Sequence, residues 1–230
     1  SPSGYIITLP GDPIFPICNA SAGNSSQAAT AATSNAPCTY FSGQGPDIAI
    51  DNITTDHYVV FGNGPNGKGG IGTGFYVSPS KGATNLTGIQ FFTAALPTRD
   101  PTAITVEGSN ANSSLLTQGS SWILLYSGTA GITVNTSTNS LASFVSISTS
   151  TAYTSYRVIA TDQLANDSST QYAEVYLYGS SASSTTSSST SSSTGSSTSL
   201  STGSSASSST GSSTSSTTGS STSTSTSVPV

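Results

Sequence analysis

The sequence contains few residues that could carry out acid–base or nucleophilic chemistry. Its 230 residues include one histidine, two cysteines and nine acidic side chains. A Ser/His/Asp site would have to use His57, which begins an expected strand, and no nucleophile elbow lies near it. Asp100 precedes a proline in an expected turn and Glu107 lies on an expected strand, so nothing marks them as the paired carboxylates of a glycosidase. We therefore expect that the protein is not an enzyme.

The two cysteines, Cys18 and Cys38, do not have the spacing of a Cys-x-x-Cys redox or zinc motif. One disulfide that closes the polar loop from Asn19 to Pro37 is the simplest prediction. Such a bond would contribute on the order of 3 kcal/mol by restricting the unfolded chain. The alternative is a pair of buried free thiols.

Potential modification sites are frequent. Asn-x-Ser/Thr sequons without an intervening proline indicate N-glycosylation in a secretory, oxidising route. The start Ser1-Pro2-Ser3 is typical of a processed mature chain. We therefore expect an extracellular glycoprotein at the cell surface or on an appendage. The sequon asparagines are Asn19, Asn24, Asn52, Asn85, Asn112, Asn135 and Asn166.

From Ser180 to Ser227 nearly every residue is Ser or Thr, so this tail cannot bury apolar area. Its Thr-Gly pairs recur every eight residues, at Thr194, Thr202, Thr210 and Thr218, which we expect to carry O-linked glycans. In an extended strand this even period would place the four glycines on one side. Dense glycans or neighbouring copies would then give the tail its shape. The alternative is a mucin-like stalk without structural register.

The charge pattern excludes two classes of partner. Only 6% of the residues are charged and the net charge is −5. The basic residues are scattered along the chain, whereas nucleic-acid binding requires clustered Lys and Arg. No apolar run approaches the roughly 20 residues of a membrane-spanning helix. We therefore expect no nucleic-acid partner and no membrane span.

Short segments rich in β-branched and aromatic residues, bounded by Gly, Pro, Asn or Ser, predict an all-β fold. No apolar period of 3.6 residues occurs over a useful length, so a β-sandwich is expected. The segment Trp122–Tyr126 is apolar throughout, which suits a strand covered on both faces; in Phe144–Ile147 we expect Val145 and Ile147 to point inward. The other expected strands are Tyr5–Leu9, His57–Phe61, Gly74–Ser78, Leu86–Thr93, Ala103–Glu107, Tyr156–Ala160 and Ala173–Tyr178.

Six motifs in order resemble the galactose-binding-like (discoidin-type) jelly roll, over roughly Ile14–Gly179. The most specific is Arg-Asp-Pro-Thr-Ala-Ile-Thr-Val-Glu-Gly-Ser-Asn, which ends at Asn110. The resemblance implies a jelly-roll β-sandwich at 14–179, preceded by an extension or strand at 1–13 and followed by the low-complexity tail at 180–230. The motifs are Asp47–Tyr58, Gly74–Pro79, Leu86–Ile89, Arg99–Asn110, Tyr156–Ile159 and Gln171–Gly179.

The resemblance also implies one structural calcium ion. The acidic residue of the family's Ala-x-Asp-Gly turn matches Asp51, and its glutamate near the last strand matches Glu174. The family's threonine falls on Asp56, a better ligand for a hard cation, and its glycine falls on Asn52. Backbone carbonyls of Asn52, Ile53 or Ala173 would complete the site. The alternative is that these acids only solvate a turn and a strand end.

Sugar binding is a second implication, because family members bind sugars with loops at one end of the sandwich. Trp122, Tyr126 and Arg157 are chemically suitable contacts. Trp122 and Arg157 also have simpler interpretations: Trp122 as a core residue, and Arg157 as a strand-borne partner of a carboxylate. Arg99 fits a turn residue that anchors its neighbour.

Two functions follow as hypotheses. In the leading one, the protein is a structural subunit of a secreted, heavily glycosylated extracellular filament, in which copies of the chain form a helical array. The Tyr5–Leu9 strand or the tail would add to the sheet edge of a neighbour. The alternative is a carbohydrate-binding, lectin-like adhesion module on a mucin-like stalk, with a polysaccharide as partner.

Overall fold

The computed structural model describes residues 4–181. The expected tail register and the O-glycosylation sites at Thr194, Thr202, Thr210 and Thr218 lie outside the described residues. The strands are β1 (Tyr5–Ile6), β2 (Ile14–Cys18), β3 (Gln27–Ala28), β4 (Thr30–Ala32), β5 (Thr39–Phe41), β6 (Tyr58–Phe61), β7 (Gly74–Val77), β8 (Thr84–Phe92), β9 (Pro101–Ser109), β10 (Ile123–Thr129), β11 (Val145–Ser146), β12 (Ser155–Gln163), β13 (Ser169–Tyr172) and β14 (Glu174–Ser181). Short 3-10 turns are η1 (Pro46–Ile50), η2 (Pro65–Gly67), η3 (Pro97–Arg99), η4 (Ser113–Leu115) and η5 (Gly119–Ser121).

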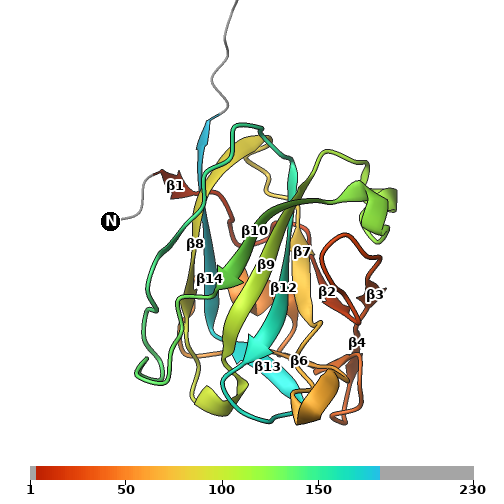
Figure 1. Ribbon diagram of the computed structural model, residues 1–230, viewed down its shortest axis with the longest axis vertical. Coiled ribbons are helices and arrows are strands. Elements are labelled where there is room, and N and C mark those ends of the chain that lie inside the picture. The colour runs from red at the N-terminus through yellow and green to blue at the C-terminus, as the bar shows by residue number, and fades with distance from the viewer. Residues whose placement is uncertain (1–3, 182–230) are drawn as a thin grey trace, which may run out of the picture. The chain divides into compact units, whose positions relative to one another are not determined.

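The strands form three sheets, which confirms the predicted β-sandwich of jelly-roll type. The first has the order β1-β14-β8-β11, and the second has the order β10-β9-β12-β7-β2-β3. The third, β13-β6-β5-β4, closes the lower end of the molecule in Figure 1. The pairing of β4 with β5 is parallel, and the other ladders are antiparallel. No helix in residues 4–181 has the length and apolarity that a bilayer crossing requires.

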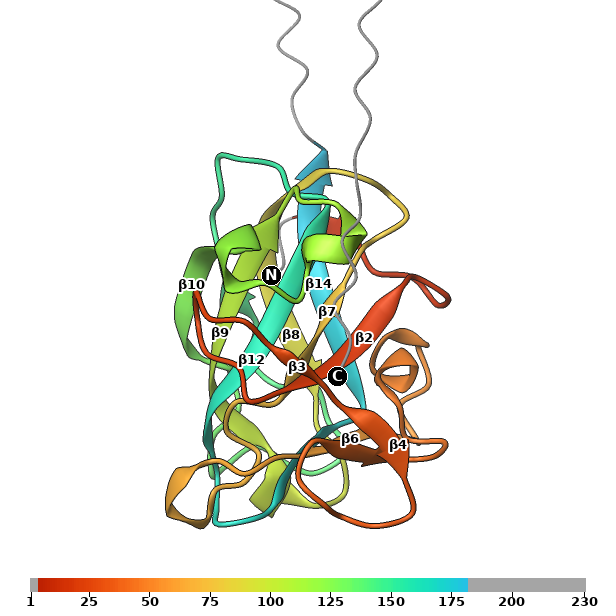
Figure 2. The ribbon, with the colours of Figure 1, turned by 90° about the vertical axis from the view of Figure 1, so that its right-hand side faces the viewer.

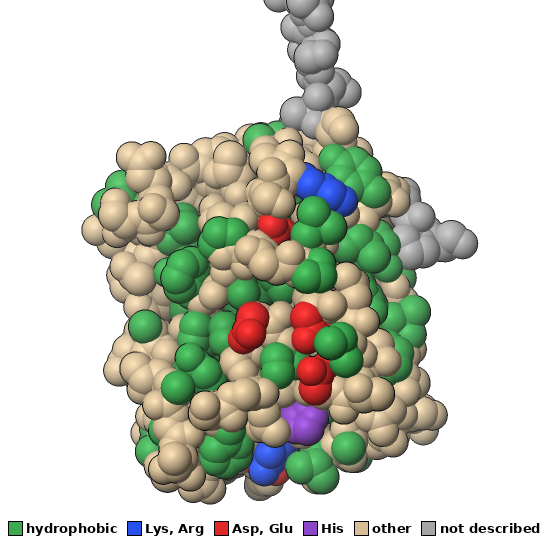
Figure 3. Space-filling model, turned by 180° about the vertical axis from the view of Figure 1, so that it is seen from behind, with side chains coloured by type: hydrophobic (Ala, Val, Ile, Leu, Met, Phe, Trp, Pro, Cys, Tyr) green, Lys and Arg blue, Asp and Glu red, His purple; other side chains and the backbone are tan. Residues whose placement is uncertain are grey.

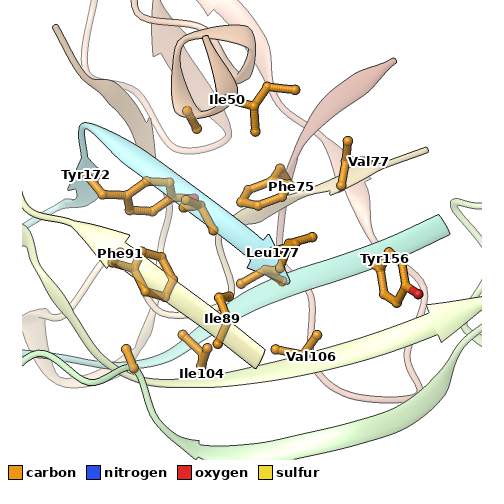
Figure 4. Close-up of a cluster of buried hydrophobic side chains, with 14 of the residues drawn as sticks. Ile50, Phe75, Val77, Ile89, Phe91, Ile104, Val106, Tyr156, Tyr172 and Leu177 are labelled. Carbon is orange, nitrogen blue, oxygen red and sulfur yellow. The ribbon is translucent and has the colours of Figure 1, made fainter. Parts of the chain in front are cut away.

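The core lies between the first and second sheets, because alternate residues of their strands face it (Figure 4). Ile89, Phe91 and Leu177 from the first sheet meet Val106 and other residues of the second sheet. Aromatic rings from the third sheet close the end, where Tyr172 packs edge-on against Tyr58 and Phe91. Val145 and Ile147 are buried, as their alternation predicted.

The segment Trp122–Tyr126 differs from the prediction of a strand covered on both faces. Trp122 is buried but precedes the strand, and β10 pairs with only one neighbour, β9. Ile123 and Leu124 are 58% and 51% exposed. The prediction was wrong because an unbroken apolar run does not distinguish a central strand from an edge strand. An open groove of about 260 Å³ runs between β10 and residues 148–151.

The outer face of the second sheet is also covered. Arg157 and Ile159 point to this face of β12, opposite to Tyr156 and Val158. Loops at residues 19–26 and 110–122 lie over it, and Figure 2 shows the loop that joins β2 to β3 passing in front of β12. The disulfide between Cys18 and Cys38 is present, with its Cα atoms 5.4 Å apart, and it ties the end of β2 to the start of β5.

The N-terminal strand is shorter than the expected Tyr5–Leu9, since only Tyr5–Ile6 pairs, against Gly179 and Tyr178 of β14 in the same chain. Of the strands that were not predicted, β13 is the most informative. All four of its residues, Ser169–Tyr172, are buried, although three of them are polar.

Candidate functional site

Two carboxyl groups meet where η1 approaches the start of β14. The backbone N–H of Ile53 donates to Asp51 Oδ1 at 2.8 Å and to Glu174 Oε1 at 3.1 Å. Glu174 is fully buried, and its Oε2 has no partner among the described residues. Burial, together with the adjacent Asp51 carboxyl, raises the pKa of Glu174 to about 8. At neutral pH Glu174 therefore tends to keep its proton, and a bound cation would have to replace that proton.

Asp56 and His57 follow on the same loop, and Figure 3 shows acidic side chains gathered near the histidine on one face. One oxygen of Asp56 is buried without a partner in the described part of the chain. His57 contacts the Gln44 amide at 3.1 Å, and burial lowers its pKa. Within residues 4–181, no three Asp, Glu, His or Cys side chains converge closely enough to hold a metal ion. The structure thus joins Asp51 and Glu174 but does not gather Asp56 with them.

These residues nevertheless fit a hard cation. Calcium takes six to eight oxygen ligands and accepts backbone carbonyls beside carboxylates, so two acidic residues can suffice. The unpartnered Glu174 Oε2 is a buried oxygen that such an ion would satisfy. Asn52, which follows Asp51, has a left-handed backbone with φ of 66°, so the turn takes a conformation that glycine prefers. Asparagine is one of the few residues besides glycine that adopt this conformation readily.

The side chains considered for sugar contact on chemical grounds are mostly buried. Trp122 is 6% exposed and donates its indole N–H to Leu116 O, so it is a core residue. Arg157 is fully buried and pairs with Glu107 across the strands, with Nε and Oε2 2.7 Å apart. Tyr126 is half-buried and donates its hydroxyl to Thr129 O at 2.9 Å. Trp122 and Arg157 are therefore excluded as surface contacts.

An open, loop-lined cavity beside η2 is a second recess that could receive a polar ligand. Its volume is about 490 Å³, and it lies between three segments far apart in sequence. These are the loop before β5, the glycine-rich loop after β6, and the turn between β12 and β13, which lies beside η2 (Figure 1). The lining residues are Asn35, Pro37, Gly62, Asn63, Gly64, Gly67, Gly69, Asn166, Asp167 and Ser168.

Backbone hydrogen bonds hold the cavity walls together. Gly62 N donates to Ser168 O at 3.1 Å, and Gly69 N donates to Asp167 O at 2.7 Å. A Cβ on Gly69 would lie 2.8 Å from the Ser168 backbone, so only glycine allows this approach. The close approach of this glycine-rich loop to residues 167–168 therefore depends on glycine at position 69.

The carboxylate of Asp167 is fixed in this wall. Arg99 Nε lies 3.2 Å from Oδ1, and Thr98 Oγ1 donates to Oδ2 at 3.2 Å. Arg99 does occupy a turn, η3, but its partner is Asp167; the expectation that it anchors its neighbour is wrong. That neighbour, Asp100, is 1% exposed with neither carboxylate oxygen partnered among residues 4–181. Burial raises the pKa of Asp100 to about 7.

What the cavity can do chemically follows from its lining. Asn35 and Asn63 are exposed, and neither side-chain amide has a partner in the described part of the chain. An amide offers a donor and an acceptor at once, as a sugar hydroxyl does. No aromatic ring lines the cavity, so a ligand would be held by hydrogen bonds rather than by stacking. This site was not predicted from the sequence, because its asparagines come from loops far apart in the chain and carry no local motif.

The acceptor asparagines of the sequons lie at the surface. Asn19, Asn24, Asn52, Asn112, Asn135 and Asn166 are exposed, and Asn85 is half-buried on β8.

Comparison with known proteins gives structural likenesses only. No protein-family model and no curated protein matches the chain. Among solved structures, it is similar to chitosan-binding module 1 of a chitosanase/glucanase from Paenibacillus sp. IK-5, with 14% identity, a TM-score of 0.46, and 76% of this chain and 99% of that chain covered. It is also similar to a family 32 carbohydrate-binding module from a family 31 glycoside hydrolase of Clostridium perfringens, with 17% identity, a TM-score of 0.47, and coverages of 61% and 86%.

A third similar structure is a family 32 carbohydrate-binding module of Clostridium perfringens in complex with galactose, with 16% identity, a TM-score of 0.42, and coverages of 60% and 87%. At these TM-scores the likenesses do not establish what this chain binds.

Proposed function

We propose that residues 14–179 form a non-catalytic carbohydrate-binding module of an extracellular surface protein, and that the cavity beside η2 receives the saccharide. The observation that carries this proposal is the polar recess of about 490 Å³, with unpartnered amides on two loops and a fixed carboxylate on the third. Amides on separate walls can donate to and accept from the hydroxyl groups of one sugar ring, and a carboxylate can accept from them.

The lining residues favour a neutral saccharide. Asp167 is the only charged residue of the cavity, and Arg99 already offsets its charge. A cationic or anionic ligand would therefore find no unpaired opposite charge. Calcium fits as a second component of the proposal: Asp51 and Glu174 would hold it with backbone carbonyls, where it would stabilise the η1 turn against β14 without contacting the sugar.

The filament hypothesis stays a prediction. Its support is the tail, which lies outside the described residues, and the sequence's secretory features. The β1 strand that was expected to link copies pairs with β14 of its own chain.

Binding of the unglycosylated protein to an array of neutral oligosaccharides tests the proposal, with galactosides included because one similar structure is in complex with galactose. Any hit is then titrated by calorimetry. We expect the double variant Asn35→Ala, Asn63→Ala to weaken binding at least tenfold, because two hydrogen bonds to the ligand are lost, each worth about 1 kcal/mol. Gln118→Ala, which removes an exposed amide outside the cavity, is the matched control. Equal affinity of the two variants would rule out the cavity.

A further inference from the structure

One sequon coincides with the wall of the cavity. All three residues of Asn166-Asp167-Ser168 are among its lining residues. No other sequon asparagine lines this cavity. Sequence spacing alone could not show this, because the opposing wall comes from residues 62–69, about a hundred positions earlier.

The local contacts leave the acceptor nitrogen available while fixing its surroundings. Asn166 is exposed, and its side-chain amide has no hydrogen-bond partner among residues 4–181. The next residue, Asp167, is held through its backbone by Gly69 and through its carboxylate by Arg99. A Cβ on Gly67 would be 3.6 Å from Asn166 Nδ2, so the η2 turn lies directly beside the acceptor. Any group attached to Nδ2 therefore starts at the cavity wall.

We propose that Asn166 carries an N-linked glycan that occupies the cavity, so that the glycosylated protein is closed to free saccharides. This inference rests on the proposed function of the same site. In the attachment, Asn166 Nδ2 forms a bond to C1 of an oligosaccharide carried on a lipid diphosphate. The bond from C1 to the diphosphate breaks, the lipid diphosphate leaves with its electron pair, and Nδ2 gives up one proton.

Tethering makes the attached sugar a strong competitor. A group joined by a short flexible link has an effective concentration in the millimolar range at the site it can reach. If the tethered sugar itself binds the cavity with a Kd of about 0.1 mM, its competition weakens the apparent binding of a free saccharide by about tenfold. The first sugars of the glycan also fill space that a free ligand needs.

The experiment compares secreted, glycosylated protein with variants of the sequon's third position. Ser168→Ala abolishes the sequon, whereas Ser168→Thr keeps it, and the Ser168 hydroxyl has no partner within residues 4–181 that either change would disturb. Peptide mass spectrometry reports occupancy at Asn166, and calorimetry with the saccharide found for the unglycosylated protein reports binding. Asn112→Gln, which removes an exposed sequon outside the cavity, is the control.

We expect Ser168→Ala to bind at least tenfold more tightly than the wild type, Ser168→Thr and Asn112→Gln. An unmodified Asn166 in the secreted protein, or equal binding by Ser168→Ala and the glycosylated wild type, would overturn this inference while leaving the proposed function intact. A lack of binding to any saccharide by the unglycosylated wild-type protein would overturn the proposed function itself.

Discussion

Replacement of Glu107 by glutamine tests the most deeply buried charge pair in the described structure. Glu107 and Arg157 are both 0% exposed. Besides Arg157, Glu107 accepts from Gly23 N at 2.7 Å, and Arg157 Nη1 donates to Asn24 O at 2.9 Å. The guanidinium carbon lies 4.9 Å from the centroid of the Trp122 ring. The pair therefore fastens the 19–26 loop onto the outer face of the second sheet.

Glu107→Gln keeps an acceptor for Gly23 but leaves the Arg157 charge buried and uncompensated. Breaking one partner of such a pair costs about 3–5 kcal/mol. Since domains of this kind are stable by only about 5–15 kcal/mol, this is a large share of the free energy of unfolding. The loss in the free energy of unfolding is measured by urea unfolding, followed by the fluorescence of Trp122, the single tryptophan.

Two controls define what the result means. The double variant Glu107→Leu, Arg157→Met removes both charges and should recover most of the lost stability, apart from the cost of leaving Gly23 N and Asn24 O unpaired. Asp162→Asn breaks the ion pair with Lys68, in which the two side chains are 49% and 26% exposed, and should cost less than about 1 kcal/mol. A cost for Glu107→Gln no larger than that of Asp162→Asn would refute the reasoning.

Three further outcomes are expected. The raised pKa of Asp100, about 7 against 3.8, stabilises the fold below pH 4, and this stability is lost as the pH rises through 7. Asp100→Asn should therefore reduce the fall in Tm between pH 5 and pH 8, and an unchanged fall would contradict the burial of this carboxyl. Millimolar calcium should raise the Tm of the wild type, and Glu174→Gln or Asp51→Asn should abolish the rise; equal responses in wild type and variants would exclude this site. Replacing Cys18 and Cys38 by serine should lower the free energy of unfolding in urea by about 3 kcal/mol, whereas a loss below about 1 kcal/mol would show that the closed loop contributes little.

The sequence was informative where local patterning and burial agree. Alternation placed Val145 and Ile147 in the core, and the motif that ends at Asn110 lies mostly on a central strand, β9. Strand β13 was missed because Ser169 and Thr170 are buried without an apolar pattern. Thr170 bonds the Thr73 hydroxyl at 2.8 Å, and only the folded chain supplies that partner.

The candidate cavity could not be predicted for the same reason, since its walls meet only in the folded chain. Asn166 was recognised as a sequon asparagine from the local sequence, and the glycines of residues 62–69 are visible there too. Their adjacency depends on the pairing of β13 with β6, which joins segments about a hundred residues apart. Likewise, the motif match named Asp51 and Glu174, but the shared Ile53 amide and the unpartnered Oε2 follow from the packing of η1 on β14.

The unpaired edge of β10 has a consequence for the tendency of the protein to aggregate. The other outermost strands, β1, β3, β4, β11 and β13, are two to four residues long, whereas β10 has seven. It carries no charged residue and no proline, which are the usual safeguards against unwanted strand pairing. Its one safeguard is the irregularity between Leu124 and Tyr126. Concentrated protein should therefore begin to aggregate along this strand, and Ile123→Lys should reduce this aggregation without disturbing the core, because Ile123 is 58% exposed.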